Sequence, residues 1–66
     1  MALVKVIEVL AEGNSVENAL ENALKEASAT VDKIQSIYVK DIQAKVENNA
    51  ISAYRVNAKV SFLIQK

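Results

Sequence analysis

The chain has 66 residues, a formal net charge of zero, no cysteine and no histidine. This length gives one domain, residues 1–66, with no room for a second core. The missing residue types exclude disulfides and the usual zinc ligands, and zero net charge gives no bulk attraction to nucleic acid. So short a chain, with 52% hydrophobic residues, usually gains its stability by association, so we expect an oligomer.

Charge is divided unevenly along the chain. Residues 1–32 carry six carboxylates and two lysines, and the second half carries the compensating positive charge. Two interpretations stay open, namely two solvated faces of opposite sign or contact between unlike parts of two copies. Lys5 and Glu8 interrupt the apolar start. We therefore expect no membrane span, no signal peptide and cytoplasmic localisation.

Residues 3–10, LVKVIEVL, are rich in β-branched side chains and predict a first strand. The two faces of this strand are nearly alike, with Leu3, Ile7 and Val9 on one and Val4, Val6 and Leu10 on the other. A strand that is apolar on both faces is usually covered on both. We expect the chain's own helix to cover one face and a neighbouring copy to cover the other.

A turn and a helix follow this strand. Gly13 is the only glycine, so it is the expected position for a positive φ angle in the turn. Asn14 or Ser15 then caps the helix, and Glu17 stands where the capping-box partner of Asn14 would stand. Apolar residues recur at helical spacing over residues 16–31, which predicts an amphipathic helix of about four turns with an alanine-rich stripe.

Alternation of side chains then predicts a second strand over about residues 36–46. Ile37 and Val39 are expected on one side of it, and the other side is expected to hold Tyr38, Ile42, Ala44 and Val46. Asn48 and Asn49 follow, and asparagine tolerates the left-handed conformation that a tight hairpin needs. The second strand is therefore expected to fold back onto a third.

The third strand is the longest element, over residues 50–65, and alternates with few breaks. At ~3.3 Å per residue it reaches roughly 50 Å if straight, whereas a compact domain of this size has a radius of gyration of about 11 Å. The strand must curl or run past its own subunit, which again favours assembly. The predicted order is strand, helix, strand, strand, with the helix on one face of a three-stranded sheet.

Nothing in the sequence indicates catalysis. There is no glycine-rich phosphate loop, and no serine has a neighbouring base to activate it. Glu8 and Asp41 are able to meet across strands, but paired carboxylates without a cleft are more often solvated or salt-bridged. We expect a protein that is not an enzyme and has no catalytic residues.

Two strings, ASATVDKIQSIYVKDI and YRVNAKVSFLI, resemble the dodecin family in their order and spacing, and the resemblance runs from about Val4 to Ile64. It implies an α+β fold (β-α-β-β) in which a three-stranded bent antiparallel sheet wraps around one helix. It also implies that the partner is the chain itself, in a hollow homododecameric shell of cubic symmetry. Dodecins typically store riboflavin, FMN or FAD in pairs at subunit interfaces.

The resemblance places Ser36 where the family's flavin-stacking tryptophan stands and Arg55 where its hydrogen-bonding glutamine stands. The chain has no tryptophan, and arginine has no acceptor for a flavin imide, so we expect flavin binding to be weakened or lost. Tyr38 and Gln43 are further candidate contacts. Tyr38 and Tyr54 suit either ring stacking or the core and interface.

The VDKI, YRV and KVSF strings are similar to a branch of the family described as calcium dodecins. That similarity implies calcium or magnesium. The similarity fixes no ligand motif, so such a site would gather Asp41, Glu47, Asn48 or main-chain carbonyls across a symmetry axis. The expected function is a non-enzymatic shell that holds small ligands or cations, and the alternatives are flavin storage and a ligand-free structural module. Arg55 suits either an ion pair, with Asp41 or a glutamate of another copy, or an anionic ligand.

Overall fold

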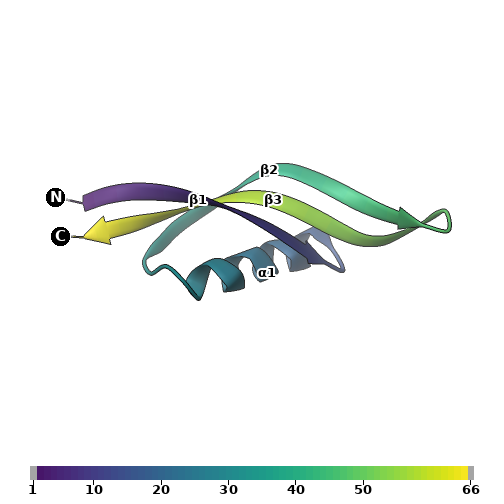
Figure 1. Ribbon diagram of the computed structural model, residues 1–66, viewed down its shortest axis with the longest axis horizontal. Coiled ribbons are helices and arrows are strands. Elements are labelled where there is room, and N and C mark those ends of the chain that lie inside the picture. The colour runs from purple at the N-terminus through teal and green to yellow at the C-terminus, as the bar shows by residue number, and fades with distance from the viewer. Residues whose placement is uncertain (1, 66) are drawn as a thin grey trace.

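The computed structural model describes residues 2–65, which form three strands and one helix (Figure 1). They are β1 (Ala2–Gly13), α1 (Val16–Ser28), β2 (Ile34–Glu47) and β3 (Ala50–Gln65). The strands form one antiparallel sheet in the order β1-β3-β2, so the longest strand lies in the middle. The predicted α+β fold, with its β-α-β-β order, is confirmed.

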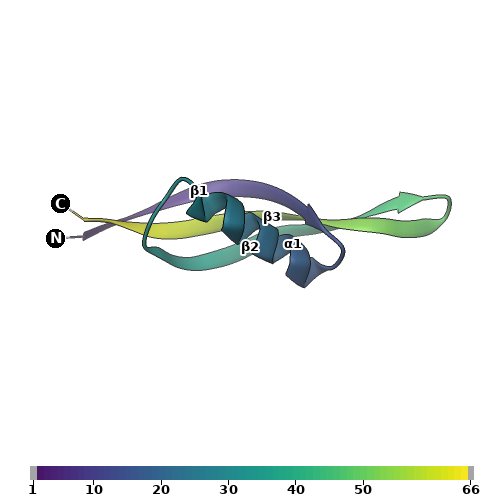
Figure 2. The same ribbon diagram turned by 90° about the horizontal axis from the view of Figure 1, so that it is seen from below.

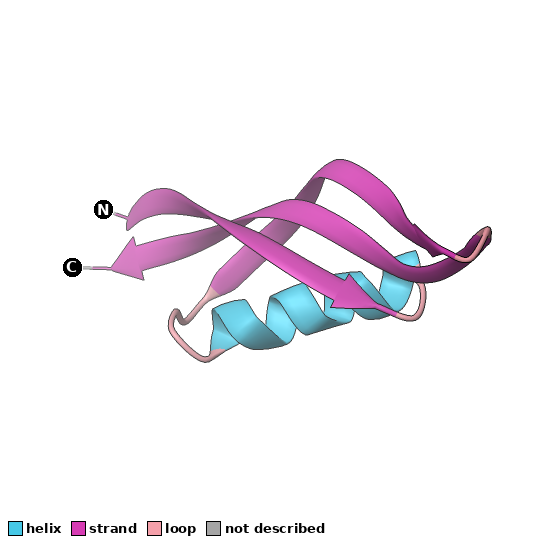
Figure 3. Cartoon of the chain, turned by 45° about the vertical axis from the view of Figure 1, so that its right-hand side comes forward, coloured by secondary structure: helices cyan, strands magenta, loops and turns pink. Residues whose placement is uncertain are grey.

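The helix packs against one face of the sheet, which arches over it (Figures 2 and 3). The buried apolar side chains come only from α1 and β3 among the described residues, and at most 9% of each is exposed: Ala19, Ala23, Ala27, Val56, Ala58, Val60 and Phe62. Alanines four residues apart form one stripe on a helix, and their small size lets the sheet approach the backbone closely. The predicted alanine-rich contact is confirmed.

We call the opposite side of the sheet, turned away from α1, the outer face. Alternation in β3 places Val56, Ala58 and Val60 toward the helix, so Arg55 and Asn57 point to the outer face. Antiparallel partners share a face, so the register assigns the rest of this face. Its residues on the flanking strands are Val4, Val6, Glu8, Leu10 and Glu12 of β1 and Ser36, Tyr38, Asp41 and Gln43 of β2.

The far part of the β2–β3 hairpin extends beyond the helix (Figure 1). We call residues 40–52 the hairpin arm, and every one of them is exposed. The molecule measures 52 × 18 × 13 Å with a radius of gyration of 13.7 Å, against about 11 Å for a compact chain of this length. Its accessible surface is 4831 Å², whereas a compact protein of this mass exposes about 4100 Å². The expected overlong strand is therefore observed.

Strand β1 is longer than predicted, since it continues through residues 11–13 instead of ending at Leu10. The expectation of a positive φ at Gly13 is wrong. A Cβ atom there would lie 2.5 Å from both the main-chain nitrogen of Ala19 and Oδ1 of Asn18. Glycine is needed at this position because the start of α1 passes close to the strand.

The ends of α1 differ in part from expectation. Ser15 is the N-cap, and its side chain accepts a hydrogen bond from the main-chain N–H of Asn18. Oδ1 of Asn18, and not Glu17, accepts from the main-chain N–H of Asn14 at 2.9 Å. The helix ends at Ser28, one turn before the predicted end, and no helix within residues 2–65 is long and apolar enough to cross a membrane.

The predicted hairpin turn is confirmed, because Asn48 and Asn49 have φ angles of 52° and 61°. The predicted faces of β2 are wrong in one respect. Lys40 is an extra residue between the Val39 and Asp41 pairings, a β-bulge. The bulge resets the alternation, so Tyr38 does not share a face with Ile42.

Candidate ligand-binding site

The outer face carries a hollow of about 80 Å³ that is lined by all three strands, through Leu10, Asp41, Gln43, Arg55 and Asn57. Two neighbouring cross-strand rows build it. The first row is Leu10, Asn57 and Asp41 in directly opposed positions on β1, β3 and β2. The second row is Glu12, Arg55 and Gln43. The hollow is thus a product of sheet register, with β3 in the centre of both rows.

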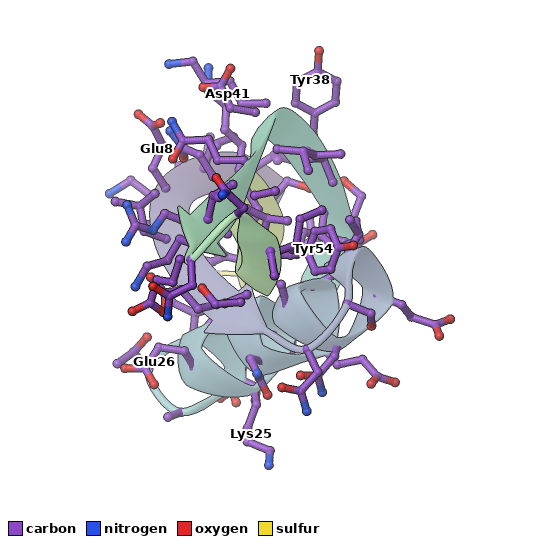
Figure 4. All side chains as sticks on the ribbon, turned by 90° about the vertical axis from the view of Figure 1, so that its right-hand side faces the viewer. Glu8, Lys25, Glu26, Tyr38, Asp41 and Tyr54 are labelled. Carbon is purple, nitrogen blue, oxygen red and sulfur yellow. The ribbon has the colours of Figure 1, made fainter. Side chains whose placement is uncertain are left out.

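The bulge at Lys40 is what brings β2 into this site. Without the extra residue, strict alternation from Ile37 and Val39, which face the helix, would turn Asp41 and Gln43 toward the helix as well. With it, both polar side chains line the hollow on the outer face. Figure 4 shows Asp41 projecting from the sheet on the side away from the helical Lys25 and Glu26.

Arg55 is bound by Glu12 at the rim of the hollow. Nε and Nη2 of Arg55 donate to the same carboxylate oxygen, Oε2, at 3.0 and 2.6 Å. Nζ of Lys45 lies 3.7 Å from that oxygen. The hydrogen bond from Arg55 is the main reason why the pKa of Glu12 lies below its ordinary value, and the charges of Lys45 and Arg55 act in the same direction. Glu12 is therefore ionised at neutral pH.

The main chain at Glu12 is also held in place. Nδ2 of Asn22, on α1, donates to the carbonyl oxygen of Glu12 at 2.8 Å. The helix therefore fixes the strand at the residue whose side chain binds Arg55. Within one chain the partner of Arg55 is therefore Glu12, a residue that the sequence did not suggest. The expected ion pair of Arg55 with Asp41 or a glutamate of another copy stays a prediction for the assembly.

Asn57 supplies an unusual feature in the middle of the hollow. Among the described residues, its Oδ1 is the buried side-chain oxygen without a hydrogen-bond partner. An acceptor that is removed from water and left unpaired costs about 1–3 kcal/mol. Because less than 1 Å² of this oxygen is exposed in the single chain, an N–H or O–H group in the hollow reaches it only when the Asn57 side chain turns toward the hollow.

The two positions that the family resemblance singled out do not lie together in one chain. Oγ of Ser36 is 2.6 Å from Oγ of Ser61, its partner on β3. Arg55 stands six residues before Ser61 on β3, which is roughly 20 Å of strand. Tyr38 lies on the outer face, 66% exposed, and points away from the body of the molecule (Figure 4). A ligand that touches both Ser36 and Arg55 would need more than one copy.

The candidate metal ligands are also separated in one chain. Asp41 lines the hollow, whereas Glu47, at the end of β2, lies six residues or roughly 20 Å away along the strand. Asn48 follows Glu47 in the hairpin turn. Within residues 2–65 there is no group of three acidic, histidine or cysteine side chains that could hold a metal ion. The acidic pair considered for Glu8 and Asp41 is replaced by a contact of 3.8 Å between Glu8 and Lys40.

Sequence reasoning identified Asp41, Gln43 and Arg55 but missed Glu12 and Asn57. A first strand that is expected to end at Leu10 leaves Glu12 in the turn that follows, which hides its position opposite Arg55. A first strand that is three residues longer and pairs antiparallel with the third places Glu12 opposite Arg55. Asn57 has no comparable signal, because a polar residue on the outer face of a strand is ordinary.

The fold and this site define a small β-α-β-β protein whose outer sheet face exposes both polar and apolar side chains to further contacts. The dodecin family model matches residues 3–65, so the chain belongs to the dodecin family. The predicted resemblance is therefore confirmed at the level of the family.

Solved structures agree with this fold. A dodecin from Streptomyces davaonensis is 20% identical with a TM-score of 0.92, over 98% of this chain and 97% of that one. A dodecin from Streptomyces coelicolor is 24% identical with a TM-score of 0.91, over 98% and 94%. A variant dodecin from T. thermophilus is 22% identical with a TM-score of 0.92, over the whole of both chains. The comparison with curated proteins found no match.

Proposed function

We propose that this single-domain chain assembles into a hollow homododecameric shell and binds a small ligand between its copies, without catalysing a reaction. The observation that carries this proposal is the uncovered apolar surface of the sheet. Leu10 on the outer face is 69% exposed, and the hairpin arm exposes Ile42, Val46 and Ile51 by more than half. Surface of this kind in a chain with so small a core indicates contact with further copies.

The small size of the hollow is the reason why we expect the ligand to lie between copies. The hollow contains a polar group without a partner, but it measures only about 80 Å³, whereas sites for small molecules usually measure 300 Å³ or more. A second copy placed over the outer face would deepen this hollow. Membership of the dodecin family supports both the assembly and the absence of catalysis.

Flavin binding is proposed to be weak. Ser36 offers no ring for stacking, and its hydroxyl is already close to that of Ser61. Stacking on an aromatic side chain contributes about 1–3 kcal/mol, and the chain has no tryptophan to supply it. One observation favours the alternative of retained flavin storage, because Tyr38 stands on the same face two residues from Ser36 with its ring exposed.

Cation binding of the calcium-dodecin kind remains a proposal for the assembled shell only. Asp41, Glu47 and Asn48 are all exposed, so oxygen atoms from several copies are free to converge on one calcium or magnesium ion. A ligand-free structural shell is the remaining possibility.

Three measurements separate these functions. Sedimentation velocity at several micromolar concentrations tests assembly, and a stable monomer would refute it. Fluorescence titration with riboflavin and FMN tests flavin storage, for which quenching with submicromolar affinity would overturn the proposal of weak binding. Calorimetry with calcium, using Asp41→Asn as the matched variant, tests cation binding. Heat that persists unchanged in that variant would exclude Asp41 as a ligand.

A further inference from the structure

The guanidinium group of Arg55 is the positive group that lines the hollow, but a carboxylate of the same chain already compensates its charge. Two of its nitrogens donate to one oxygen of Glu12, with the shorter contact at 2.6 Å. Lys45 approaches the same carboxylate at 3.7 Å. An incoming anion would therefore have to displace a carboxylate that is tethered beside Arg55.

The rest of the lining also disfavours an anion. Asp41 contributes a second carboxylate, and the buried Oδ1 of Asn57 is an acceptor without a partner. An acceptor and a carboxylate both repel a phosphate oxygen, whereas both accept a hydrogen bond from an N–H or O–H group. The lining thus favours a neutral hydrogen-bond donor.

We propose that Glu12 sets the charge selectivity of the hollow, by occupying Arg55 so that the hollow takes an uncharged N–H or O–H donor and excludes phosphate and carboxylate groups. This inference rests on the proposed function, in which the hollow contributes to the ligand site. Glu12 is a positioning residue here, because it acts through Arg55. Its main chain is fixed for this role by Asn22 of α1, at 2.8 Å.

The test is calorimetric titration of the full chain with inorganic phosphate. Glu12→Gln and Glu12→Ala both remove the competing charge, and Glu12→Ala also removes the acceptor. We expect phosphate affinity to rise roughly tenfold in Glu12→Ala, and by less in Glu12→Gln, because a like charge beside the site no longer opposes the anion. Two variants are used so that a fold defect in one does not decide the result, and circular dichroism checks each.

The control is Glu8→Gln, which removes the same charge from the same face of β1. Glu8 lies 3.8 Å from Lys40 and does not line the hollow, so this variant should bind phosphate as weakly as the wild type. The double variant Glu12→Ala, Arg55→Gln should lose the gain. An equal gain in Glu8→Gln, a gain that survives without Arg55, or no gain in either Glu12 variant would each overturn the inference.

The phosphate titration distinguishes a failure of this inference from a failure of the proposed assembly. Phosphate titration gives a result whether the chain is a monomer or a shell, and it requires no flavin. A shell without the gain in phosphate affinity refutes only the role of Glu12. A monomer that shows the gain refutes the proposed shell and leaves the charge selectivity of the hollow intact.

Discussion

Glu12 and Arg55 stand directly opposite each other on β1 and β3, and one oxygen of Glu12 accepts two hydrogen bonds from Arg55. The main-chain carbonyl oxygen of Glu12 accepts a hydrogen bond from the side-chain amide of Asn22 on α1, and the Glu12 carboxylate lies near Lys45 of β2. Glu12 therefore joins all four elements of the fold at the rim of the hollow. Replacement of Glu12 should lower the stability of the fold as well as change the ligand selectivity of the hollow.

The pairing of Glu12 with Arg55 predicts a dependence of stability on pH. The pKa of Glu12 is lowered in the folded chain from its ordinary value of 4.5. A group whose folded pKa is depressed contributes stability that is present above the unfolded pKa and lost as pH falls through the folded pKa. As the pH is lowered below about 4.5, the melting temperature of the wild type should therefore fall more steeply than that of Glu12→Gln. Parallel curves for the two proteins would contradict this.

The close approach of α1 to Gly13 predicts that Gly13→Ala destabilises the fold. The added methyl group would meet the main-chain nitrogen of Ala19 at 2.5 Å, and main chain inside a helix has little freedom to move. We expect the free energy of unfolding to fall by about 1–3 kcal/mol, as for other overpacked sites. Urea unfolding at fixed protein concentration measures this change in the free energy of unfolding. Unchanged stability would show that α1 does not pass so close to β1.

Leu10 of β1, which is 69% exposed on the outer face, predicts where copies meet. Leu10→Glu places a charge on the outer face and should shift the protein to smaller species, because burying a leucine contributes about 1.5–3 kcal/mol and burying an unpaired carboxylate costs more. Leu24→Glu is the matched control, since Leu24 is also exposed, at 42%, but lies on α1. Sedimentation velocity compares the two. Equal effects would show that the outer face has no special role.

The proposed weak flavin binding predicts a gain of function. Ser36→Trp supplies the stacking ring that the chain lacks, which should raise flavin affinity by about 1–3 kcal/mol, or roughly 5- to 150-fold. Ser28→Trp, on the exposed end of α1, is the control and should leave the affinity unchanged. Riboflavin fluorescence quenching measures both. A gain of equal size in the control would mean that any exposed tryptophan suffices.

Local rules predicted most of the fold. Alternation alone oriented β3, because its period never breaks between Val56 and Phe62. Two asparagines predicted the hairpin turn, since few other residues accept positive φ angles. Ser15 was one of the two expected N-caps. These signals lie within a few residues of the feature that they predict.

The site was harder to predict, because it depends on features that short-range patterns do not contain. The bulge at Lys40 changes which side chains of β2 share a face, and its presence follows from pairing with β3, not from the local sequence. Strand β1 extends to Gly13 because β3 offers partners up to Tyr54. Tertiary pairing thus created the row of Glu12, Arg55 and Gln43.

We expect this chain to bury its exposed apolar surface by assembling with copies of its own sequence. Native mass spectrometry measures this assembly directly. We expect a species with the mass of twelve copies of the 7.2-kDa chain, retained on dilution to low micromolar concentration. A single 7.2-kDa species under the same conditions would contradict it.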